Sequence, residues 1–124
     1  MPCTPADFRR LALALPRTEQ RRHMNHPDFR VNGIIFATLG YPDRQHGMVK
    51  LTSAQQEDFV SAYSRAFSPV AGAWGRKGCT SVLLPQANKR ALKEAILAAW
   101  RNHAPADLAL ASLKRKSTSG RNRR

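Results

Sequence analysis

The sequence predicts an α+β domain in which helices pack on one face of an antiparallel sheet. Apolar residues recur at helical spacing near both ends of the chain, while residues 19–51 are rich in β-branched and aromatic residues separated by turn signals. The 124 residues, 42% of them hydrophobic, suffice for one core without a metal or a disulfide framework. We therefore expect residues 1–113 to form a single domain, followed by a basic, disordered tail over residues 114–124.

An N-terminal helix is predicted to begin after Thr4. Thr4 can cap the helix, Pro5 suits the first helical position, and Asp7 favours the positive end of the helix dipole. One buried stripe is then expected at Phe8, Leu11, Ala12 and Leu15. Pro16 lacks an amide hydrogen and disfavours helical backbone at the residue before it, so we expect the helix to end at Leu15.

Residues 19–51 are predicted to form an antiparallel β-meander. Its apolar runs include residues 29–31, 34–39 and 48–51, and the Asn32-Gly33 pair between the first two runs is a hairpin signal. Cations alternate with apolar residues along these strands, so we expect one apolar face under the helices and one face that carries cations.

The second half of the chain is predicted to add helices and a further strand. Thr52 and Ser53, with glutamines three residues later, form a plausible capping box, and Asn88 can cap a long helix that Ala104-Pro105 ends. The expected elements are a helix from about residue 53 to Arg65, a strand from Thr80 to Leu84, a long C-terminal helix after Asn88 and a short helix over residues 106–116.

A glycine-rich loop connects the second helix to that strand, within the segment FSPVAGAWGRKGCTSVLL (residues 67–84). Glycine at every third position suits neither a helix interior nor a strand interior, which favours an irregular loop. We interpret Trp74 as a core anchor of this loop in preference to a surface on which a ligand stacks. The loop lacks the order GxxxxGK[ST] of a P-loop, so Arg76 and Lys77 would bind a phosphate only as part of a backbone nest.

The charge of the chain favours a polyanionic partner. The formal net charge is +13, and residues 1–113 alone hold fifteen cations against eight acids. Such an excess attracts nucleic acid, although a generally cationic surface without that role is the alternative. The residues that we expect to contact nucleic acid are Arg21, Arg30, Lys50, Arg76 and Lys77, with Lys114, Arg115 and Lys116 from the tail.

No catalytic residue, metal site or cofactor is predicted. The four histidines lack HxxxH or HExxH spacing, and the acids are too scattered for a carboxylate pair. Cys79 is better explained as a small hydrophobe on a strand than as a nucleophile. Cys3 and Cys79 form no CxxC motif, and no signal peptide or membrane-spanning run is visible, so we expect a cytoplasmic protein.

Several segments together resemble the MmcQ/YjbR-like family of small bacterial domains. They are LALALP (residues 11–16), HPDFRVNGIIFATL (26–39), VKL (49–51), AFSPVAGAWGRKGCTSVLL (66–84), AAW (98–100) and AP (104–105). The resemblance covers about residues 5–110, with one departure at Cys79, where an aromatic residue is expected. It implies a frataxin-like or double-wing α+β fold and DNA binding. Iron is not expected, because iron-binding frataxins have an acidic ridge that this chain lacks.

The function predicted from the sequence is that of a non-enzymatic DNA-binding protein. It would contact the phosphate backbone, of double-stranded DNA in the first instance, as a monomer or weak homodimer without a cofactor. The alternative is an adaptor that binds a protein or a small ligand in a groove near Trp74.

Overall fold

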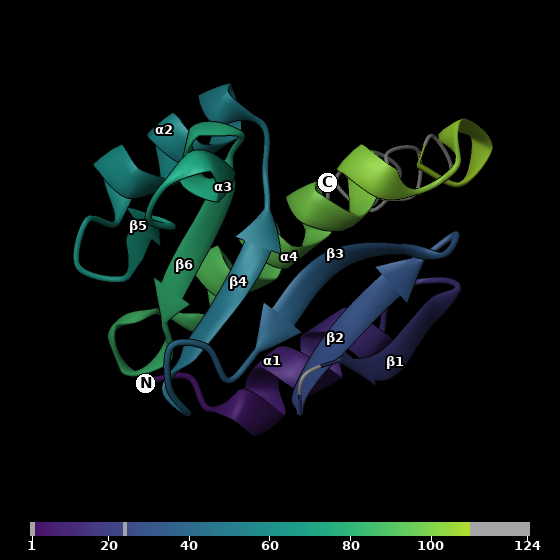
Figure 1. Cartoon of the computed structure of the whole chain (residues 1–124), viewed down its shortest axis with the longest axis horizontal. Helices are drawn as coiled ribbons and strands as arrows, with labels where there is room; N and C mark the ends of the chain where they lie inside the picture. The colour runs from purple at the N-terminus through teal and green to yellow at the C-terminus, as the bar shows by residue number, and fades with distance from the viewer. Residues whose placement is uncertain (1, 24, 110–124) are drawn as a thin grey trace, which may run out of the picture.

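The computed structural model describes residues 2–23 and 25–109, which form six strands and four helices (Figure 1). In chain order these are α1 (Pro5–Leu13), β1 (Thr18–His23), β2 (His26–Val31), β3 (Ile34–Leu39), β4 (His46–Lys50), α2 (Ser53–Ala62), β5 (Phe67–Pro69), α3 (Ala73–Arg76), β6 (Cys79–Leu83) and α4 (Lys89–His103). A single turn of 3-10 helix, Leu84–Gln86, joins β6 to α4. The predicted α+β class is confirmed.

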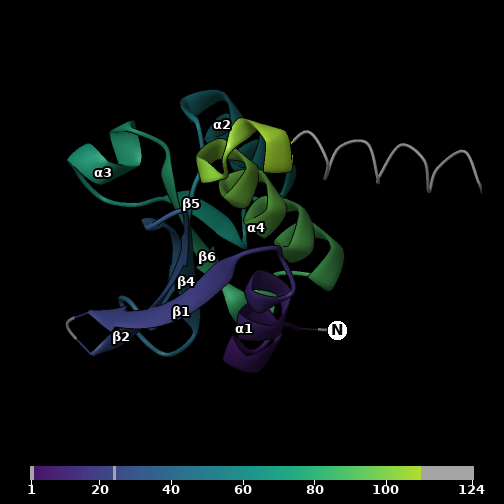
Figure 2. The ribbon, with the colours of Figure 1, turned by 90° about the vertical axis from the view of Figure 1, so that its right-hand side faces the viewer.

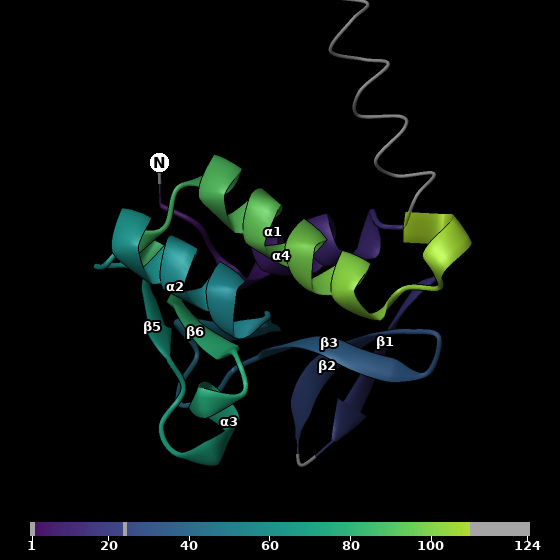
Figure 3. The same cartoon turned by 90° about the horizontal axis from the view of Figure 1, so that it is seen from above.

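The strands form one antiparallel sheet in the order β1-β2-β3-β4-β6-β5. Helices α1, α2 and α4 lie on one face, whereas α3 stands on the opposite side (Figures 2 and 3). The core fills the space under the helices and includes Phe8, Phe29 and Trp100, all without exposed surface. The Trp100 indole N–H donates to the carbonyl oxygen of Pro16 at 3.0 Å, which satisfies the polar atom of this buried ring.

Local sequence signals account for the main boundaries. Thr52 and Gln55 form the predicted reciprocal capping box of α2, and the Asn88 side chain accepts from the backbone N–H of Ala91 at the start of α4. Asn32 and Gly33 have φ angles of 54° and 76°, the backbone of a two-residue hairpin turn between β2 and β3. The predicted meander is therefore confirmed.

Some predicted boundaries and one predicted loop differ from the structure. Helix α1 ends at Leu13 and α2 at Ala62, each a few residues early. The segment predicted as an irregular loop contains strand β5 and the short helix α3. Residues 67–69 form a strand because they pair with β6 at the edge of the sheet. Residues 106–109 are helical, and the remainder of the short helix expected to residue 116, like the tail from residue 114, lies outside the described residues.

No helix in the described part of the chain is long and apolar enough to cross a bilayer.

Candidate nucleic-acid interface

The face of the sheet opposite α1, α2 and α4 is called the open face. Strand pairing aligns one residue from each strand in a single row across it. Pairing places Arg21 of β1 opposite Asp28 of β2 and continues through β3, β4, β6 and β5. The remaining members are Thr38, Met48, Ser81 and Ser68. Paired residues share a face, so this row crosses the open face of the sheet from edge to edge.

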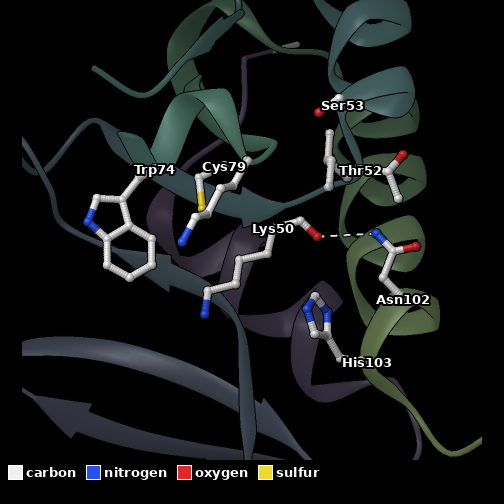
Figure 4. A pocket seen from close by; sticks show the side chains of 9 residues that line it. Lys50, Thr52, Ser53, Trp74, Cys79, Asn102 and His103 are labelled. Carbon is white, nitrogen blue, oxygen red and sulfur yellow. Dashed lines mark hydrogen bonds between the residues drawn. The ribbon is translucent and has the colours of Figure 1, made fainter. Parts of the chain in front are cut away.

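A groove of about 860 Å³ lies along this open face. Strands β3 and β4 form its floor with Ile35 and Met48. The β3–β4 loop contributes Tyr41 and Pro42, and the segment around α3 contributes Val70 and Trp74. A smaller recess of about 550 Å³ adjoins it between α3, the start of α2 and the end of α4 (Figure 4). Lys50, Trp74 and Cys79 line both hollows.

Trp74 is 62% exposed, so the predicted core anchor is wrong. Helix α3 lies on the open-face side of the sheet (Figure 3), and its Trp74 side chain is exposed to solvent. Trp100 is the tryptophan that is buried in the core. The Lys50 Nζ lies 5.9 Å from the centroid of the Trp74 ring and the Lys77 Nζ lies 6.0 Å from it. Both distances are in the range of a cation–π contact. The structure thus brings Lys50, Lys77 and Trp74 together around the recess, where Figure 4 labels Lys50 and Trp74.

The segment that carries Trp74 is fixed from beneath by close backbone packing. A Cβ at Gly78 would lie 2.0 Å from the carbonyl oxygen of Leu51, and φ at Gly78 is +110°, so only glycine suits this position. The Gln56 side-chain amide donates to the carbonyl oxygens of Gly75 at 2.9 Å and Cys79 at 3.0 Å. The glycines therefore let α3 dock tightly while its tryptophan stays in solvent.

The two lysines beside Trp74 have no carboxylate partner within 4.0 Å among the described residues. Lys50 is half-buried and Lys77 is exposed. Arg76 is exposed on the same helix, but it lines neither hollow. These ammonium groups are available to an anionic ligand.

The predicted cations of β1 and β2 are engaged by acids. Arg30 donates to both carboxylate oxygens of Asp28, at 2.8 and 3.1 Å, and this hydrogen bonding raises the pKa of Arg30. The Arg21 Nε lies 3.3 Å from Glu19, and both of these side chains are exposed. Among the predicted site cations in the described residues, those without an ion-pair partner are therefore Lys50, Lys77 and Arg76. Lys114, Arg115 and Lys116 lie outside the described residues.

Thiol chemistry gains no support at Cys79. Its side chain is buried on β6, and burial raises the pKa of the thiol in spite of nearby Lys50 and Lys77, whose charges act to lower it. A raised pKa keeps the thiol protonated and unreactive near neutrality. Over residues 2–23 and 25–109, no group of three or more His, Cys, Asp or Glu residues converges on a possible metal site.

Two groove features were missed by reasoning from sequence. Tyr41 lies in the turn-like segment GYPD, which does not by itself predict that the ring is 65% exposed and lines the groove. Met48 lies in the predicted strand over residues 48–51, but the register that places it on the floor depends on pairing with β3 and β6. An aromatic residue within the turn-like segment GYPD was the one feature of the sequence that could have indicated Tyr41. No local feature of the sequence indicates the register that places Met48 in the groove.

Comparison with known proteins supports the same fold. The crystal structure of Deinococcus radiodurans protein DR2400, with a domain of the DUF419 family, is similar at a TM-score of 0.67 and 16% sequence identity over 80% of this chain and 77% of that chain. At this identity the similarity concerns the fold alone. No curated protein matches the sequence. The sequence pattern of the YjbR family matches residues 13–102, which span β1 to β6 and nearly all of α4. The chain therefore belongs to the YjbR family.

Proposed function

We propose that this protein is a non-enzymatic DNA-binding protein that contacts phosphate groups with the open face of its sheet. The observation that carries the proposal is the pair of lysines, Lys50 and Lys77, beside exposed Trp74, where the recess adjoins the groove. Ammonium groups without acid partners exchange readily between counterions and phosphates, which is the main source of sequence-independent affinity for DNA.

Other cations contribute less directly. Arg76 follows Trp74 on α3 and is exposed, so it can reach a backbone that leaves the groove. Arg30 shares its charge with buried Asp28, and we therefore expect a smaller contribution from it than from Lys50. The tail residues Lys114, Arg115 and Lys116 would add affinity that does not depend on the groove.

The salt dependence of binding tests this proposal. Affinity of the full chain for labelled duplex and single-stranded DNA is measured by fluorescence anisotropy over a series of salt concentrations. The variant Lys50→Gln/Lys77→Gln should bind more weakly, and the slope of log affinity against log salt should decrease in magnitude by about 2. Lys89→Gln/Lys93→Gln is the control, because it removes the same charge from exposed positions on α4, which lies on the helix-covered side (Figure 3). The Lys89 Nζ lies 3.9 Å from Asp7, so a melting curve of this variant checks that its fold is retained.

A further variant separates the tail from the groove. Lys114→Gln/Arg115→Gln/Lys116→Gln should lower affinity without removing the effect of the Lys50 and Lys77 substitutions. The proposal fails if the full chain binds neither form of DNA at low salt, or binds without salt dependence. A groove pair with no more effect than the α4 pair would also contradict it.

A second candidate is a small-ligand adaptor, which the size and lining of the groove favour. Its volume of about 860 Å³ lies in the range of ligand pockets, and apolar residues such as Ile35, Met48 and Val70 contribute to it. Native mass spectrometry of the purified full chain would detect a retained metabolite. Met48→Arg, which places a long cation in the groove, should release that metabolite if this candidate is correct.

A further inference from the structure

We infer that the groove binds unpaired bases, which stack on Trp74 and Tyr41, so that the favoured ligand is single-stranded nucleic acid. The inference rests on the proposed function and names the form of nucleic acid that the groove accepts. Phosphate contacts by lysine do not distinguish paired from unpaired strands, whereas aromatic surfaces do, because the faces of paired bases inside a continuous duplex are already stacked on one another.

The exposed aromatic residues are the first observation. The large hydrophobic residues exposed in the described part of the chain are Leu13, Ile34, Tyr41 and Trp74. Both aromatic members of this set line the same groove, although they are 33 positions apart in the sequence. Scattered exposed aliphatic residues are ordinary on protein surfaces, but two exposed aromatic rings in one concave site indicate a ligand with flat apolar faces.

The segments that carry the two rings lie near opposite ends of β4. The Gly40 amide, next to Tyr41, donates to the carbonyl oxygen of His46 at 2.9 Å, and the Lys50 ammonium lies beside Trp74. β4 spans His46–Lys50, so about 13 Å of extended strand separates the two ends. This separation suits two different bases of one strand better than one mononucleotide.

Contacts fix the backbone that carries Trp74, and the ring of Tyr41 packs against a neighbouring ring, before a ligand arrives. Trp74 is carried by α3, which the Gln56 amide and the packing of Gly75 against Val70 fix to the sheet. The Tyr41 and His26 rings form a T-shaped pair, with centroids 6.1 Å apart and planes at 75°. A preformed aromatic surface loses little conformational entropy on binding, so more of the stacking energy appears as affinity.

The polar groups of the groove favour binding of a nucleic-acid strand whatever its base sequence. The floor between the rings includes the hydroxyl-bearing residues Thr38, Ser68 and Ser81, and each hydroxyl can donate or accept a hydrogen bond. Lys50 and Lys77 lie next to Trp74, where the phosphate of a stacked nucleotide would be expected. This combination of aromatic faces and cations is the usual chemistry of proteins that bind single strands without sequence preference.

The test compares three ligands with the full chain. These are a labelled oligodeoxythymidylate of about 12 nucleotides, a duplex of the same length, and thymidine monophosphate as competitor. We expect the oligonucleotide to bind more tightly than the duplex and much more tightly than the mononucleotide. Trp74→Ala should weaken oligonucleotide binding by about 5- to 150-fold, Tyr41→Ala should weaken it less or equally, and Trp74→Phe should retain most of it.

Controls keep the result specific to stacking. Leu13→Ala removes an exposed apolar side chain from α1, on the helix-covered side, and should leave affinity unchanged. Tryptophan fluorescence gives an independent signal, because Trp100 is buried and Trp74 is exposed. Quenching by the oligonucleotide should disappear in Trp74→Phe, a variant expected to fold normally because the side chain it changes is largely in solvent.

The outcomes separate this inference from the proposed function. If duplex binds as tightly as the single strand and Trp74→Ala has no effect, the inference is overturned while lysine-dependent DNA binding stands. A mononucleotide that binds as tightly as the oligonucleotide overturns the assignment to a strand. If no DNA binds at low salt, the proposed function itself is overturned.

Discussion

Gly75 packs against the carbonyl group of Val70 so closely that a Cβ at residue 75 would lie 1.7 Å from the Val70 oxygen. This contact joins the two ends of the segment that presents Trp74, and it leaves no room for any other side chain. Because the opposing atom belongs to the backbone, it cannot rotate away. The position of the backbone that carries the indole therefore depends on a residue that lines neither hollow.

Gly75→Ala is expected to destabilise the protein by about 3 kcal/mol, at the upper end of the range for overpacking. Gly72→Ala is the matched control in the same segment. Gly72 has a φ of +79° and a ψ of −152°, a backbone region that few residues except glycine adopt, but an added Cβ would meet open space, so its cost should be about 2 kcal/mol from backbone strain alone. Urea denaturation followed by circular dichroism measures both values. If the two substitutions lowered the free energy of unfolding equally, the contact with Val70 would not be the main reason that residue 75 must be glycine.

Arg30→Ala is expected to lower stability by about 3 kcal/mol, because it removes a bidentate partner from the fully buried carboxylate of Asp28. Arg21→Ala, which breaks an exposed pair with Glu19, should cost less than about 1 kcal/mol. Thermal and urea unfolding of both variants tests the contrast. If both variants were as stable as the wild type, the Arg30–Asp28 pair would make no measurable contribution to stability.

Asp7→Asn should lower the melting temperature at neutral pH and have little effect in strong acid. The pKa of Asp7 lies below its ordinary value of 3.8, first because of the hydrogen bond from Arg10 and then because of the Thr4 backbone amide. A carboxylate with a lowered pKa stabilises the fold above pH 3.8, and that contribution disappears as pH falls through the lowered value. Melting curves from pH 7 downward should therefore converge for the two proteins. Asp58→Asn, at an exposed position of α2 without an ion-pair partner among the described residues, should match the wild type throughout.

The two cysteines should react slowly with a thiol reagent in the native protein and rapidly after denaturation. Both are buried, and burial is the main cause that raises the pKa of each thiol. A raised pKa lowers the fraction of reactive thiolate at neutral pH, and burial also restricts access. The time course of reagent absorbance with and without urea measures the difference. A fast native phase that disappears in Cys79→Ser would instead reopen the possibility of chemistry at this residue.

Local patterns in the sequence determined most of the fold. The Thr4 and Thr52 caps, the Asn32-Gly33 turn and the period-two pattern of residues 29–51 each depend on neighbours along the chain. The three-to-four-residue spacing of apolar positions in α4 likewise fixes the face that covers the sheet. These features could be predicted because the physical cause of each lies within a few residues.

Only the tertiary structure decided the composition of the candidate site. Composition and spacing identify Lys50, Lys77 and Trp74 as candidates, but for Trp74 they favour a core anchor over a stacking surface because its side chain is large and apolar. Its exposure follows from the docking of α3 on Val70 and Leu51, contacts that involve backbone atoms and leave no pattern in side-chain hydrophobicity. The pairing of Arg30 with Asp28, and the meeting of Tyr41 with Trp74 in one groove, depend on register across the sheet. Register is set by the packing of the whole domain, so no short segment of the sequence could specify it alone.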